Sequence, residues 1–143
     1  RTSPYPMLSL FDAPDSNVTC TRRERSNTPL QALTLWNDPV FAEAAAHLAS
    51  RILNAEIDDP ASVVHRIQHA FVLCFARKPS PEEIRAVESL LRESERIYKA
   101  DLEAAKKVVG ETSGAPDHAL SLRAAWVSVA RTLMNLDEFI TRP

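Results

Sequence analysis

The segment TPLQALTLWNDP, residues 28–39, contains two helix starts in close succession. Thr28 can accept a backbone N–H as an N-cap, Pro29 suits the first helical position, and Gln31 stands where a capping-box partner belongs. The Asp-Pro pair at the end of the segment repeats the arrangement. The segment therefore predicts two helices, over about 29–36 and 39–54.

The remainder of the chain continues this pattern of helices that begin at prolines. The sequence SPEE at residues 80–83 combines an N-cap serine, a proline at the first helical position and an acidic first turn. An aspartate before Pro60 gives another start, and apolar residues recur at helical spacing after each of these points. Three further helices are predicted, over about 60–76, 81–109 and 117–139.

The composition favours a helical fold. Only two glycines occur among 143 residues, and strand-rich folds need glycine for their turns. The sequence therefore predicts an all-α protein, in which residues 28–143 form an irregular antiparallel helix bundle. Residues 1–27, rich in proline and arginine, are predicted to form an extended arm that packs on the bundle. The side chains expected to share the core are Trp36, Phe41, Phe71, Leu90 and Trp126.

The charge and hydropathy patterns narrow the range of partners. The formal net charge of -2 gives no reason to expect nucleic acid or an anionic membrane as a partner. No apolar run approaches the roughly 18 residues that a spanning helix needs, so we expect no membrane span in this segment. The chain opens on Arg1 rather than Met, and we expect it to be a fragment of a larger protein.

Two histidines have a spacing that suits a metal. His65 and His69 are one helical turn apart, which places both imidazoles on one face. The residue after His65 is Arg66 rather than the glutamate of a zinc hydrolase, and no third ligand follows. We expect surface histidines rather than a metal site, and we expect the same of His47.

Cys20 and Cys74 are the only thiols, and their spacing fits no metal-binding or redox motif. In an exported protein they could form a disulfide between the arm and the third predicted helix. Cys74 also lies on the apolar side of that helix, where a buried free thiol is common. No CxxCH motif is present, so we expect no haem attachment and no other cofactor in this segment.

Three arginines, Arg22, Arg23 and Arg25, stand just before the first predicted helix of the bundle. They could hold a phosphate, sulfate or carboxylate beside that helix start. Alternatively they pair with Asp12 and Asp15 and fasten the arm. The sequence shows no nucleophile-base pair, Gly-rich phosphate loop or close carboxylate pair, so we identify no catalytic residue and do not expect the segment alone to be an enzyme.

Several short segments resemble one known family. They are FDAP at 11–14, Cys20 with RRER at 22–25, NTPLQAL at 27–33, NDP at 37–39, RKPSPEE at 77–83 and NLDEF at 135–139. As a set they are similar to the C-terminal part of the planctomycete PSD domain, a domain of unknown function (1553). That resemblance implies a large exported bacterial protein, periplasmic or on the cell surface, in which an upstream part of the domain, and in some members a cytochrome c domain with haem c, come first.

The resemblance leaves two kinds of function open. The first, which we favour, is a non-catalytic C-terminal helical module that packs on the upstream domains of its own chain or on other periplasmic or cell-surface proteins. The second is part of an oxidoreductase or carbohydrate-active enzyme, in which Arg22, Arg23 and Arg25 form one wall of an anion or substrate site.

Overall fold

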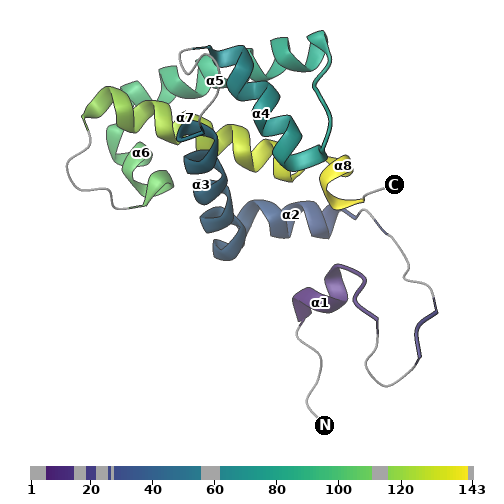
Figure 1. Ribbon diagram of the computed structural model, residues 1–143. Helices are drawn as coiled ribbons and strands as arrows, with labels where there is room; N and C mark the ends of the chain where they lie inside the picture. Colours follow the sequence, from purple (N-terminus) through teal and green to yellow (C-terminus); the bar gives the residue numbers. More distant parts are fainter. Residues whose placement is uncertain are drawn as a thin grey trace.

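The computed structural model describes residues 6–14, 19–21, 26, 28–55, 62–110 and 116–141 (Figure 1). Within these residues there are eight helices and no strand, which confirms the predicted all-α fold. None of the described helices combines the length and the apolar character that crossing a bilayer requires. The helices are α1 (Pro6–Leu10), α2 (Pro29–Asn37), α3 (Pro39–Leu53), α4 (Val63–Phe75), α5 (Pro81–Ala100), α6 (Leu102–Val109), α7 (Asp117–Met134) and α8 (Asp137–Ile140).

Local capping signals place the starts of α2, α3 and α5 where the sequence predicts them, whereas α4 begins at Val63 with Ser62 as its N-cap, later than the predicted start at Pro60. At α2, Gln31 N donates to Thr28 Oγ1 over 3.3 Å, while Thr28 N donates to Gln31 Oε1 over 2.9 Å. Ser80 and Glu83 form the same capping box at α5, with distances of 3.2 and 2.6 Å. Asp38 caps α3 by accepting from Val40 N over 2.8 Å. Each box satisfies backbone donors that the first turn leaves without a helical partner.

The fourth and fifth predicted helices are each interrupted. Asp101 takes a non-helical conformation (φ −134°, ψ 87°), and its carboxylate accepts from Ala104 N over 2.9 Å as the N-cap of α6. A short acidic side chain readily makes such a local bond in place of continuing a helix. The break lets α5 and α6 both contact α7 (Figure 1). Near the C-terminus, Asn135 ends α7 and α8 follows as a separate short helix.

The end of α4 carries a backbone conformation that is costly for its residue. Ala76 adopts the left-handed conformation, with φ 57° and ψ 25°, as the C-cap of α4. Glycine is the usual residue there, because a Cβ atom crowds the neighbouring carbonyl in this conformation.

The arm differs from the predicted extended segment. Residues Pro6–Leu10 form the short helix α1, so the prediction of a wholly extended arm is wrong for these residues. Pro6 stands at the first helical position, where a proline is tolerated because that N–H has no helical partner. The prediction for residues 1–5, 15–18, 22–25 and 27 lies outside the described residues.

The core is organised around α7, which contacts α3, α5 and α6 (Figure 1). Trp126 and Phe71 are almost fully buried, while Phe41 and Leu90 are partly buried against the same cluster. Trp36 is 42% exposed, so its predicted place in the core is wrong. A smaller cluster of Ala105, Leu120 and Ala124 lies where α6 meets α7.

Candidate functional site

The arm is joined to the bundle through one buried amide. Gln31 is 1% exposed, and besides its role in the capping box its Nε2 donates to Leu10 O over 2.8 Å and to Ser26 Oγ over 3.0 Å. Ser26 in turn donates from both its backbone N and its hydroxyl to Asp12 Oδ2, each over 2.7 Å. A residue that the sequence marks as a cap therefore also ties the arm to α2.

Aromatic packing reinforces this junction. The ring of Phe11 lies 5.9 Å from the ring of Phe41 in α3, with an interplanar angle of 55°. Tilted aromatic pairs at this separation are favourable. The end of α1 is thus held by both polar and apolar contacts to α2 and α3.

The outer side of α2 carries an exposed apolar surface, which we call the apolar row. It consists of Leu30, Leu33 and Trp36 of α2 with Val40 at the start of α3, and their exposed fractions are 62%, 57%, 42% and 61%. The opposite side of α2 turns Gln31 and Leu35 inward. The row is the densest run of exposed large apolar side chains among the described residues, because the other five are scattered over α1, α4, α5 and the α7–α8 connection.

Trp36 within the row is held by a cation. The Arg131 guanidinium of α7 lies 4.7 Å from the Trp36 ring centroid, and its Nη2 donates to the Trp36 carbonyl. Two buried polar atoms, Arg131 Nε of α7 and Oδ1 of Asn135 just after this helix, have no hydrogen-bond partner among the described residues. The contact with Arg131 holds the Trp36 side chain at the surface and explains why it does not enter the core.

A second ionic cluster joins the ends of α4, α5 and α8. Arg77 forms two-pronged hydrogen bonds with Glu83 (2.7 and 2.9 Å) and with Glu138 (2.7 and 2.6 Å). Its guanidinium also lies 5.3 and 5.7 Å from the ring centroids of Phe71 and Phe75.

The Arg77 bonds, with a backbone bond from Ser80, lower the pKa of Glu83 to about 2. The Arg77 bond likewise lowers the pKa of Glu138, and both carboxylates raise the pKa of Arg77. Each guanidinium nitrogen of Arg77 and each carboxylate oxygen of Glu83 and Glu138 makes a hydrogen bond, so the cluster stabilises the fold.

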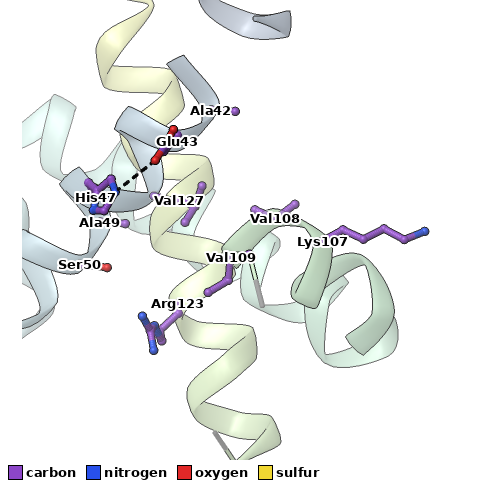
Figure 2. A pocket seen from close by; sticks show the side chains of 12 residues that line it. Ala42, Glu43, His47, Ala49, Ser50, Lys107, Val108, Val109, Arg123 and Val127 are labelled. Carbon is purple, nitrogen blue, oxygen red and sulfur yellow. Dashed lines mark ion pairs between the residues drawn. The ribbon is translucent and has the colours of Figure 1, made fainter. Parts of the chain in front are cut away.

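A pocket of about 440 Å³ opens between α3, α6 and α7 (Figure 2). Its apolar lining comes from alanines of α3 and from Val108, Val109 and Val127. Its polar lining comprises Glu43, His47, Ser50, Lys107 and Arg123. His47 Nε2 lies 3.8 Å from Glu43 Oε1, and both side chains are largely exposed. From the sequence we expected His47 to be an ordinary surface residue, with no role in a pocket. The available signal was the run of small alanines around it, which leaves room between α3 and its neighbours.

Among the residues that the structure describes, the candidate metal ligands are not brought together. His65 is exposed and His69 half-buried on α4, and no group of three or more potential ligands occurs in the part of the chain that the structure describes. Cys20 is exposed, whereas Cys74 is buried and burial raises the pKa of its thiol to about 11. The sequence favours free thiols over a Cys20–Cys74 disulfide, and that choice stays a prediction. Arg22, Arg23 and Arg25 lie outside the described residues, so the anion site predicted there also stays a prediction.

The N-terminal two thirds of the molecule matches a known protein family. The family is PSD1, described as a protein of unknown function (DUF1553), and the match covers residues 1–91. The chain belongs to the PSD1 family. The matched part carries α1 to α4 and the first half of α5, and thus the arm junction and the apolar row. In this PSD1 member, α6, α7 and α8 follow the match. Neither a curated protein nor a solved structure matches the chain.

Proposed function

We propose that this chain is a non-catalytic helical module of a larger exported bacterial protein, and that it docks through the apolar row onto the preceding part of that protein. The observation that carries the proposal is the run of four exposed apolar side chains, Leu30, Leu33, Trp36 and Val40, along α2 and the start of α3. Clustered apolar surface is costly to leave in water and commonly marks a protein interface.

The chemistry of the row suits an interface. Tryptophan and arginine are enriched among the residues that contribute most to binding, and Trp36 with Arg131 forms such a pair at the row. The cation also restrains the tryptophan before binding, which lowers the entropic cost of docking. The four side chains of the row are themselves uncharged, so none of them loses the hydration of an ion on docking.

The position of the row favours a partner within the same polypeptide. The arm is fixed to α2 by Gln31 and to α3 by Phe11, so a preceding segment would be tethered to the same two helices that carry the row. Covalent linkage gives such a segment a high effective concentration, and a small apolar interface then suffices for stable docking. The high effective concentration that covalent linkage provides distinguishes a partner segment of the same polypeptide from a separate protein that diffuses freely.

The cellular setting in this proposal derives from the resemblance to planctomycete PSD domains. We infer an exported protein, periplasmic or on the cell surface, whose other domains include a cytochrome c domain with haem c in some members. Cell fractionation of the source bacterium and a visible absorption spectrum of the longer protein test these two inferences. A protein confined to the cytoplasm would contradict export, and a haem c band would identify the longer protein as one of the members that carry the cytochrome domain.

The docking proposal is tested by a charge placed in the row. Leu33→Glu is compared with Val72→Glu, since Val72 is a similarly exposed apolar residue on α4. The isolated chain should tolerate both changes, because each side chain is at least half exposed. Binding of the separately expressed preceding segment, measured by calorimetry, should be lost with Leu33→Glu and kept with Val72→Glu. Equal binding by both variants would overturn the proposal.

A further inference from the structure

We propose that the pocket between α3, α6 and α7 binds a small monocarboxylic acid with an aliphatic body. None of the four residues of the apolar row lines the pocket, which is bounded on two sides by α6 and α7, and these helices follow the segment matched by the family model. It is therefore a second and separate site on this chain.

The size and lining of the pocket fit a small organic ligand. Its volume of about 440 Å³ falls within the roughly 300–1,000 Å³ that is typical of small-molecule sites, which commonly occur between the helices of bundles. Ala46 and Ala49 of α3 line the pocket together with Val109 and Val127, and these four side chains present only carbon to it. An aliphatic chain placed there would be removed from water on several sides.

One cation is positioned to receive a negative group. Arg123 is half-buried on α7, and no salt bridge or hydrogen bond engages its side chain among the described residues. In Figure 2 its guanidinium lies on the side of the pocket that carries His47 and Ser50, whereas Lys107 extends away from them. A guanidinium matches a carboxylate through two parallel hydrogen bonds, and the hydroxyl of Ser50 and the imidazole of His47 supply further polar partners.

The same surroundings disfavour a phosphate. The pocket is bounded by Val108, Val109 and Gly110, which form the C-terminal end of α6, where backbone carbonyls create a partial negative charge. Glu43 adds a full negative charge at the rim, although it is paired with His47. A dianion would meet this repulsion without gaining from the aliphatic lining. A monocarboxylate places one charge at Arg123 and its carbon chain against the alanines and valines.

The proposal is tested by titrating the chain with sodium hexanoate and following the methyl NMR signals of Val109 and Val127. We expect saturable shifts of both signals, and we expect inorganic phosphate and hexan-1-ol not to reproduce them. Arg123→Gln should raise the dissociation constant for hexanoate at least about tenfold, since a charged hydrogen bond is lost. Arg92→Gln is the matched control because it removes an equal charge from an exposed position on α5.

A second variant tests the cavity itself. Ala46→Leu places a larger side chain in the pocket lining and should abolish the hexanoate shifts while Arg123 remains in place. If Ala46→Leu does not fold, the comparison of hexanoate affinity between Arg123→Gln and Arg92→Gln is sufficient to test the proposal. Hexanoate that fails to shift the valine signals, affinity unchanged in Arg123→Gln, or displacement of hexanoate by equimolar phosphate would each overturn the proposal. Because the apolar row is a different surface, this proposal and the docking proposal can fail independently.

Discussion

Replacing Gln31 by methionine should release the arm from the bundle. Methionine has nearly the same length and volume, so packing around this buried position is largely kept. The amide hydrogen bonds to Thr28 N (2.9 Å), Leu10 O (2.8 Å) and Ser26 Oγ (3.0 Å) are lost. At about 1 kcal/mol net for each bond, the free energy of unfolding should fall by about 3 kcal/mol. About 2 kcal/mol of that loss belongs to the two bonds that hold the arm.

The matched control is Thr28→Ala. This change removes the hydroxyl cap of α2 and leaves the three bonds of the Gln31 amide in place. Its expected cost is about 1 kcal/mol, the usual value for loss of an N-cap side chain. Chemical denaturation of the two variants and the parent chain gives the comparison of global stability.

Amide hydrogen exchange then distinguishes arm release from general destabilisation. The amide of Ser26 donates to Asp12 and that of Ala13 donates to Leu8 O, so both report on the arm. In Gln31→Met their exchange should accelerate roughly thirtyfold, which corresponds to about 2 kcal/mol. In Thr28→Ala the acceleration should be much smaller. Equal exchange of these amides in both variants, or a Gln31→Met protein as stable as the parent, would refute the role given to Gln31.

Three further changes have expected outcomes that thermal or chemical unfolding can check. Trp126→Ala removes an almost fully buried side chain and should cost about 3–5 kcal/mol; an unchanged midpoint would show that the indole does not pack as described. Ala76→Gly relieves the left-handed backbone at φ 57° and should stabilise by up to about 1 kcal/mol, and a loss of stability would contradict the strain. Arg77→Met should cost about 1–2 kcal/mol near neutral pH. Because Arg77, together with a backbone bond from Ser80, lowers the pKa of Glu83 from 4.5 to about 2, that stabilisation is present above pH 4.5 and is lost as the pH falls toward 2. Parent and variant stabilities should therefore converge in acid, and a gap that stays constant with pH would argue against the ionic origin.

The helix starts were predictable because their signals are local. Thr28 with Gln31, and Ser80 with Glu83, are only three residues apart, and the capping boxes form as their side-chain chemistry dictates. The break at Asp101 was missed because its only signal is one aspartate inside a helical pattern. That break decides where α6 lies, and so whether a pocket exists.

Contacts between distant segments were not predictable in the same way. Gln31 reaches Leu10, 21 residues away, through an amide that is also required locally, so its local role hides the distant one. The two-turn helix α2 has apolar residues on both sides, and the pattern alone did not show that Leu35 rather than Trp36 faces inward. The partner that decides this, Arg131, comes from α7.

Hydroxyl-radical footprinting, resolved to single side chains by mass spectrometry, tests the docking of the apolar row most directly. The labelling rates of Leu33 and Trp36 are compared between the isolated chain and the longer protein. Val72 and Ile97, which are 50% and 48% exposed on α4 and α5, serve as internal controls. We predict that labelling of the row falls several-fold in the longer protein while the controls keep their rates. Labelling of Leu33 and Trp36 at the same rate in both proteins would contradict the proposal that the row is a docking surface.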